Sequence, residues 1–427
     1  MRDPGKVLDE FDRMAQLELW PTFDPHRIPL ALYDGQRTLL LRHPRPPQGF
    51  RELPEPPGVC AFEGQHPSVR ANTSIELEGI PTATLLLDET RSAEELAATL
   101  LHEAFHVFQR ERHPDWCANE AELFVYPVED VDVLRTRWLE TEALRRALAE
   151  RDLAQAAKWA ACALEIRRER FRTLPEGSVA YERGTELNEG LAQYIESLAL
   201  GKPISPLPEE VAAEEVRLRG YAVGHALALL LDRLDPAWKG KLEAEEASSL
   251  DELLQATLDR LGIRPARFTQ QDQENALSWA KSEAERLRAR REALRGEFSK
   301  QPGWRIVIEA EEPLWPQGFD PMNVHRLGEK EVLHTRWLKL GNEAGTLEIL
   351  DRPCLTEAAG EHPLFHGVRR VVITGLPIAT DLGVGSKSGV VSIRTEGVKV
   401  EFRAARIERA DQSLILHVHK SPESSES

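Results

Sequence analysis

Residues 100–109 read Leu-Leu-His-Glu-Ala-Phe-His-Val-Phe-Gln, and this stretch decides the fold around it. Apolar residues at helical spacing around His102 and His106 predict a single α-helix. Side chains four positions apart lie on one helix face, about one turn or roughly 5.4 Å apart, so both imidazoles can reach one metal ion. Glu103 is offset from both histidines and can accept a proton from a water molecule at that ion, as a general base does.

The ends of this helix are also visible in the sequence. Ser92 and Glu95 have the spacing of a capping box, and the step from His113 to Pro114 predicts the last turn. A single histidine on an apolar helix face is more often a core residue than a ligand. Two histidines at this spacing, with a glutamate between them on a capped helix, favour a metal site.

A catalytic zinc ion usually takes three protein ligands and leaves its fourth position to water, so a third ligand is needed. The metzincin pattern places a glycine and a third histidine just downstream of the first two ligands. Those positions carry Gln109 and Arg112 here, and His113 comes one place too late. The third ligand is therefore expected from a more distant segment.

Residues 185–194 read Thr-Glu-Leu-Asn-Glu-Gly-Leu-Ala-Gln-Tyr and contain the pattern Asn-Glu-Gly-x-Ala. Together with the His-Glu-x-x-His helix, this segment resembles the gluzincins, the superfamily of thermolysin and the alanyl-aminopeptidase-type enzymes. The resemblance implies that His102, His106 and Glu189 hold one Zn²⁺ ion per chain. Glu182 and Glu186 share the helix face of Glu189, so either could replace it as a ligand or hold a ligand imidazole. If Glu189 is the ligand, we expect the Glu186 side chain to lie beside the metal ligands or in solvent.

Residues 220–230 begin with Gly-Tyr-Ala-Val-Gly-His and continue with apolar residues. They are similar to the gluzincin segment that supplies the transition-state tyrosine. By that resemblance Tyr221 donates a hydrogen bond to the oxyanion, and His225, one turn later, is the alternative donor. The Gly-x-Met-Glu-Asn segment of aminopeptidases is absent near residues 72–79, so the resemblance does not extend to their specificity for a free amino group.

The composition indicates which binding partners and which cellular compartment to expect. Lys and Arg number 54 and Asp and Glu 71, which gives a net charge of −17 and argues against nucleic acid and anionic membranes as partners. The four cysteines show no Cys-x-x-Cys spacing, which favours free thiols in a reducing compartment. The N-terminus has no apolar signal-peptide core, and no apolar run reaches the length of about 18 residues that a membrane helix needs. These features predict a cytoplasmic protein, whose oligomeric state the sequence does not indicate.

At 427 residues the chain is long enough for two or three domains. The predicted fold class is α+β, with a mainly helical, gluzincin-like catalytic domain between an N-terminal β-sheet and a C-terminal all-β domain. The N-terminal part contains a hairpin signal, Asp34-Gly35, and a proline-rich surface connection over 44–57. After Pro302 the spacing of apolar residues changes from a period of 3.6, typical of helices, to a period of 2, typical of strands. The predicted segments are a β-rich subdomain at 1–90, a zinc-binding catalytic domain at 91–300 with a helical-hairpin insertion at about 131–174, a β-sandwich or barrel at 301–420, and a disordered tail at 421–427.

These patterns favour a zinc-dependent hydrolase, and first a metallopeptidase with Glu103 as general base. The extended stretch at 72–77 is the expected sheet edge along the active site. Such an edge pairs with extended backbone, which predicts a peptide or peptide-like substrate. Two alternatives remain open: a zinc-dependent hydrolase of a non-peptide substrate, and a non-catalytic, zinc-stabilised interaction protein.

Overall fold

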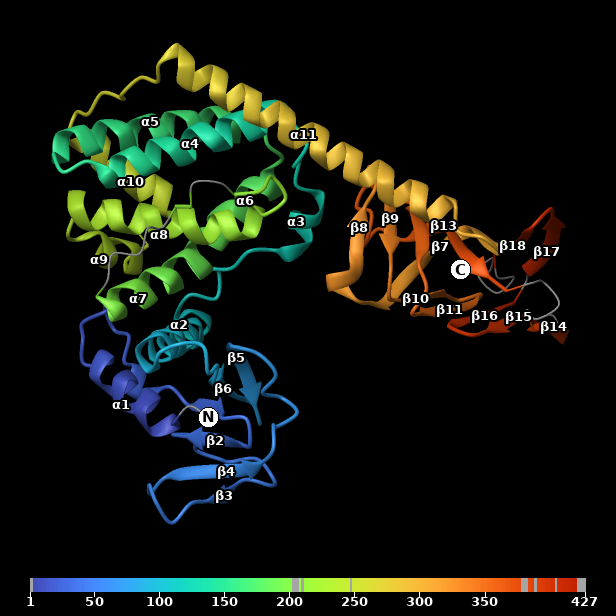
Figure 1. Cartoon of the computed structure of the whole chain (residues 1–427), viewed down its shortest axis with the longest axis horizontal. Coiled ribbons are helices and arrows are strands. Elements are labelled where there is room, and N and C mark those ends of the chain that lie inside the picture. The colour runs from blue at the N-terminus through green and yellow to red at the C-terminus, as the bar shows by residue number, and fades with distance from the viewer. Residues whose placement is uncertain are drawn as a thin grey trace, which may run out of the picture. The chain divides into compact units, whose positions relative to one another are not determined.

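The computed structural model describes residues 3–201, 207–208, 211–245, 248–377, 383–387, 390–403 and 405–420. It forms two compact units, Met1–Ala284 and Glu285–Ser427, which divide within the long helix α11 (Gln270–Ser299). The first unit combines a β-sheet with helices and the second is all β after α11, so the predicted α+β class is confirmed (Figure 1). The predicted disordered tail at 421–427 lies outside the described residues.

The N-terminal sheet has six strands. Across the sheet they are β3 (Arg51–Glu52), β4 (Val59–Glu63), β2 (Arg37–Leu41), β1 (Leu30–Tyr33), β6 (Ile80–Leu86) and β5 (Thr73–Leu77). The predicted hairpin is confirmed: β1 and β2 pair antiparallel, and the Asp34 carboxylate closes the turn by accepting hydrogen bonds from two backbone N–H groups. The predicted connection over 44–57 is mostly exposed, and within it lies the two-residue strand β3, which was not predicted. A strand of two exposed residues has no hydrophobic period to reveal it.

Helix α2 (Ala93–Arg112) carries both histidines and packs against β5, β6 and α1 (Pro4–Met14). Its predicted ends are confirmed, with a complete capping box between Ser92 and Glu95 and His113 as C-cap. Its apolar residues share one core with strands of the sheet and with the later helices. The sheet and the helices of the first unit therefore share their largest core, and smaller apolar clusters lie elsewhere in the sheet and among the helices.

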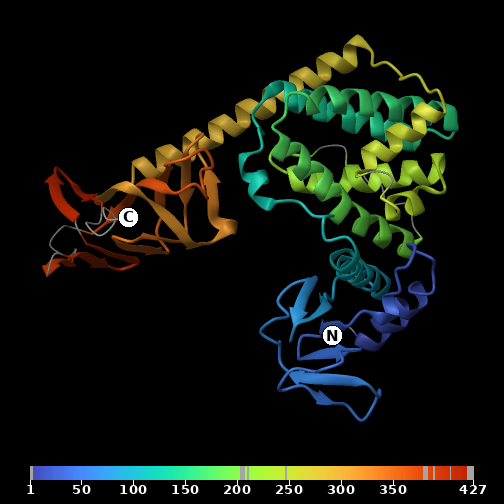
Figure 2. The same ribbon diagram turned by 180° about the vertical axis from the view of Figure 1, so that it is seen from behind.

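The remaining helices of the first unit follow α2. Helices α4 (Val131–Ala149) and α5 (Leu153–Phe171) lie side by side as the predicted hairpin (Figures 1 and 2). The Asp152 side chain caps the N-terminus of α5. Two six-residue helices, α3 and α9, were not predicted because each is too short to show a period. The described helices here are α3 (Glu120–Val125), α4 (Val131–Ala149), α5 (Leu153–Phe171), α6 (Glu176–Thr185), the π-helix η2 (Glu186–Gly190), α7 (Leu191–Leu200), α8 (Val216–Leu234), α9 (Trp238–Glu243) and α10 (Leu250–Arg260).

The second unit is organised around the 16-residue strand β7 (Trp304–Phe319). One part of β7 pairs with β13 (Val368–Leu376) and β18 (Ser413–Val418), and its end pairs with β10 (Trp337–Asn342). Apolar side chains from β7 and from the strands on either side of it pack together in one common core. The other strands are β8 (Val324–Arg326), β9 (Glu331–His334), β11 (Gly345–Leu350), β12 (Cys354–Ala358), β14 (Gly383–Lys387), β15 (Val390–Thr395), β16 (Val398–Arg403) and β17 (Ala405–Ala410). Over the described residues of both units, we find no helix with the length and apolar character needed to cross a bilayer.

Candidate metal centre

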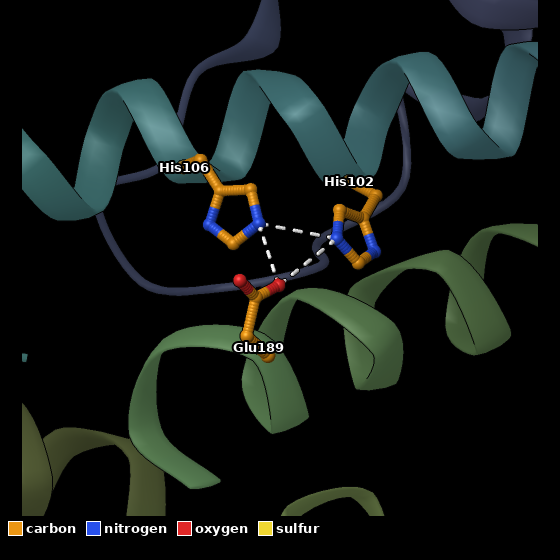
Figure 3. A group of neighbouring side chains, drawn as sticks. All are labelled: His102, His106 and Glu189. Carbon is orange, nitrogen blue, oxygen red and sulfur yellow. Dashed lines mark hydrogen bonds and ion pairs between the residues drawn. The ribbon is translucent and has the colours of Figure 1, made fainter. Parts of the chain in front are cut away.

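His102 and His106 project from one face of α2 toward Glu189, which comes from the π-helix η2 on the other side of the site (Figure 3). The two Nε2 atoms lie 3.1 Å apart, and Glu189 Oε2 lies 3.1 Å from His106 Nε2 and 3.8 Å from His102 Nε2. The three side chains are nearly buried, with exposed fractions of 11%, 12% and 9%. Among the residues that the structure describes, this is the group whose donor atoms converge as metal ligands do.

The spacing of the three donor atoms fits a tetrahedral ion. With ligand bonds of about 2.0 to 2.2 Å, two ligands of a tetrahedral zinc ion lie about 3.3 to 3.6 Å from each other. The observed separations of 3.1, 3.1 and 3.8 Å bracket that range. Two neutral nitrogens and one carboxylate are also donors that zinc accepts. The same three groups make hydrogen bonds and ion pairs with one another, so the geometry allows a metal ion without identifying it.

Gln109 fixes the orientation of the second histidine. Its Nε2 donates to the carbonyl oxygens of Leu187 and Asn188, at 2.9 and 3.0 Å, so its Oε1 must face His106. That oxygen lies 2.8 Å from His106 Nδ1 and can only accept a hydrogen bond. The proton of a neutral His106 is therefore on Nδ1, and the lone pair of Nε2 points into the site.

Glu196 lies behind the first histidine, at an ion-pair distance. Its Oε2 lies 3.3 Å from His102 Nδ1, and its Oε1 accepts a hydrogen bond of 2.8 Å from the Thr99 hydroxyl. A carboxylate behind a ligand imidazole orients the ring and raises its basicity. The sequence interpretation missed both Glu196 and Gln109. The signal for Glu196 was its position seven residues after Glu189, which is about two helical turns and the same face.

The charges of the site act strongly on one another. Burial alone would lower the pKa of His102, but the contacts with Glu189 and Glu196 outweigh it and raise that pKa to about 9. Burial would raise the pKa of Glu189, but its contacts with both histidines and with Tyr221 hold it well below its usual range. Burial raises the pKa of Glu103, in spite of the two nearby imidazoles. The site thus contains an ionised carboxylate, Glu189, and a second buried glutamate, Glu103, whose pKa is raised.

The structure separates the two predicted oxyanion donors. Tyr221 lies at the site, with its ring stacked near that of His102 at a centroid distance of 6.5 Å and its hydroxyl bonded to Glu189. His225 is fully buried one turn later, beside the ring of Tyr194. Neither of its ring nitrogens has a hydrogen-bond partner within the described part of the chain, and burial lowers its pKa to about 4. Tyr221 is therefore the better placed of the two candidates.

The glycines of the two motifs explain how α8 comes so close to Glu189. A Cβ atom added to Gly190 would lie 2.6 Å from Gly224 Cα, and one added to Gly224 would lie 2.5 Å from the Glu186 carbonyl oxygen. Backbones can approach this closely only where both residues lack a side chain. The contact brings Tyr221, on the same helix as Gly224, next to the ligand that precedes Gly190.

The predictions for Glu182 and Glu186 are wrong. Glu186 is neither a ligand nor solvated nor beside the ligand imidazoles: it is buried and pairs with both terminal nitrogens of Arg167, at 2.8 and 2.5 Å. Glu182 pairs with Arg170 in the same buried cluster. The helix face of Glu189 does not continue through them, because the π-helix η2 inserts an extra residue into the turn and rotates the preceding residues away from the site.

No protein-family model, no curated protein and no solved structure matches this chain. The expected resemblance to gluzincins therefore comes from the three sequence segments.

Proposed function

We propose that this protein is a zinc-dependent metallopeptidase of the gluzincin type, with one Zn²⁺ ion held by His102, His106 and Glu189. The observation that supports it best is the orientation of His106: Gln109 holds its Nδ1 so that the Nε2 lone pair points toward the other two donor atoms. Without an ion, this lone pair can accept a hydrogen bond from His102 Nε2, 3.1 Å away, and a bound zinc ion would take the place of that proton. A bound zinc ion would supply Lewis acidity for the carbonyl and lower the pKa of water to about 7.

The residues around the ligands have the roles that peptide hydrolysis requires. Glu103 accepts the proton of the attacking water, and its burial favours this because burial raises the pKa of the carboxyl. Tyr221 donates a hydrogen bond to the oxygen that becomes negative as the carbonyl is attacked. Glu196 and Gln109 hold the two imidazoles in place and do not touch the substrate. A purely structural metal site would have no use for Glu103.

The sheet supports a peptide as the substrate. Strand β5 is at the edge of the N-terminal sheet and packs against α2, the helix of both histidines. Within the described residues no strand pairs with its outer side, so its free N–H and C=O groups can pair with an extended chain. Such pairing binds peptide backbone of many sequences. The side chains preferred at the cleavage site do not follow from it.

Metal content tests this proposal directly. We expect purified wild-type protein to contain one zinc ion per chain by inductively coupled plasma mass spectrometry after dialysis. His106→Ala and Glu189→Ala should lose most of it, whereas His26→Ala, which changes an exposed histidine outside the site, should keep it. Equal zinc in all four proteins would refute the ligand set. Zinc bound normally in a protein that cleaves no peptide in a broad library would favour a non-peptide substrate or a non-catalytic, zinc-stabilised interaction protein.

A further inference from the structure

The two oxygens of Glu189 face different partners. Oε2 faces the two imidazoles, whereas Oε1 accepts a hydrogen bond of 2.8 Å from Arg217 Nη2. The guanidinium is thus on the side of the carboxylate that points away from the histidines. A carboxylate can bind a metal ion through one oxygen or through both, and the neighbour of the second oxygen decides between the two modes.

Arg217 is itself held in place. Its Nη1 donates a hydrogen bond of 2.9 Å to Glu120 Oε1, from helix α3. It lies on α8 one turn before Tyr221, and its side chain is 45% exposed. The guanidinium therefore bridges two carboxylates from different elements, which limits how far it can move from Glu189. A lysine at this position could not make both contacts in the same fixed plane.

We infer that Arg217 is a positioning residue that commits Glu189 to the metal ion through Oε2 alone. The inference rests on the metal site proposed above. A tetrahedral ion with two imidazoles and one carboxylate oxygen keeps its fourth position for water. If Oε1 also bound the ion, it would compete for that position. Arg217 prevents this by occupying Oε1.

The inference has a spectroscopic test that needs no substrate. Cobalt can replace zinc in such sites, and its visible absorption is strong in four-coordinate geometry and weaker when a fifth ligand is added. We expect Arg217→Met to keep one metal ion per chain, to lose part of the cobalt visible absorption, and to gain one oxygen neighbour in the X-ray absorption spectrum of the zinc form. Arg217→Lys, which keeps the charge but not the fork of donors, should give an intermediate spectrum.

Arg135→Met is the matched control, because Arg135 also bridges two carboxylates, Asp132 and Glu169, with an exposed fraction of 25%, and lies outside the site. Its cobalt spectrum should equal that of the wild type. Glu120→Gln provides a second route to the same result if Arg217→Met does not fold: weakening the other contact of Arg217 should shift the spectrum in the same direction, by less. Identical spectra in wild type, Arg217→Lys and Glu120→Gln would overturn the inference. A wild type that binds no metal would instead refute the proposed function, before Arg217 is tested.

Discussion

Glu186 and Glu189 are three residues apart on the same π-helix, yet they belong to two polar clusters of opposite character. Glu186 lies in an ionic network in which Arg167, Arg170 and Arg219 pair with Glu140, Glu182, Glu186 and Asp251. The positive charges of this network are guanidinium groups, and at its margin Asp251 also pairs with Arg183, whose side chain is 30% exposed. The seven other residues are buried and come from α4, α5, α6, η2, α8 and α10.

The metal centre is not balanced in this way. Glu103, Glu189 and Glu196 bring three negative charges, and the two arginines that pair with them in the described residues, Arg91 and Arg217, are 34% and 45% exposed. Without an ion, the third positive charge is a proton on His102, whose pKa is raised to about 9. The comparison teaches how to distinguish two buried polar clusters: one whose positive charges are all arginines supports the fold, and one that relies on an exchangeable proton can bind a cation in its place.

The largest expected effect concerns Glu103, which we propose acts in catalysis without binding the metal ion. Glu103→Gln should reduce hydrolysis of peptides by about 10² to 10⁴-fold, because the amide cannot accept the proton. Zinc content and thermal unfolding should stay at the wild-type level, since Glu103 is not one of the three ligands. Cleavage of a fluorescence-quenched peptide library is the measurement. Full activity in Glu103→Gln would contradict the proposed general base.

The buried ionic network gives the second prediction. Arg167→Met should lower the free energy of unfolding by about 3 to 5 kcal/mol, because it leaves the buried Glu140 and Glu186 without their shared partner. Zinc binding should weaken as well, since Glu186 anchors the helix segment that carries Glu189. Arg267→Met, which breaks an exposed pair with Glu165, should cost only about 0 to 1 kcal/mol. Urea unfolding compares the three proteins, and equal losses in both variants would show that the network does not stabilise the fold.

The contact between η2 and α8 gives the third prediction. Gly190→Ala should destabilise the protein by about 1 to 3 kcal/mol and weaken zinc binding, because the new methyl group would meet the backbone of Gly224. Gly240→Ala is the control: this glycine lies in α9 with no atom near its Cβ direction, and alanine favours a helix by about 1 kcal/mol. Thermal unfolding and zinc competition with a chelator measure both effects. A tolerated Gly190→Ala would mean that the close approach of the two helices is unnecessary.

Sequence patterns predicted the parts of the site that depend on local spacing. A capped helix with two histidines four residues apart has a defined geometry, so α2 and its ligand pair could be predicted. The position of Glu189 followed only from its resemblance to a family motif, and the fold brings it to the histidines across more than eighty intervening residues.

The missed features are those that depend on long-range contacts. Arg217 and Glu196 look like ordinary charged residues of a helix until another helix lies beside them. The π-helix could not be predicted, because one extra residue in a turn leaves the apolar pattern almost unchanged. This extra residue changes the direction in which Glu186 points, which is why the prediction for Glu186 is wrong. Short or exposed elements, such as α3 and β3, lack a period long enough to be recognised.

The last expected effect comes from a histidine whose surroundings are the reverse of those of His102. His334 on β9 is buried with no carboxylate partner among the residues that the structure describes: its Nε2 lies 3.3 Å from the Thr356 hydroxyl, and the residue opposite it on β12 is the buried Cys354. Burial lowers its pKa from 6.5 to about 4, whereas the pKa of His102 is raised to about 9. The two histidines thus show, in the two units, what a nearby carboxylate does to a buried imidazole.

This lowered pKa makes stability depend on pH in a definite direction. Between pH 6.5 and 4 the unfolded chain binds a proton at His334 that the folded chain excludes, so stability is complete above pH 6.5 and falls as the pH is lowered. At pH 5 the loss from this residue should be about 2 kcal/mol. His334→Gln removes the titrating group, so urea unfolding at pH 7, 6 and 5 should show a smaller decrease for the variant than for the wild type. Parallel pH curves for the two proteins would mean that His334 is protonated in the folded state with no cost, and that burial without a counter-charge does not suppress its charge.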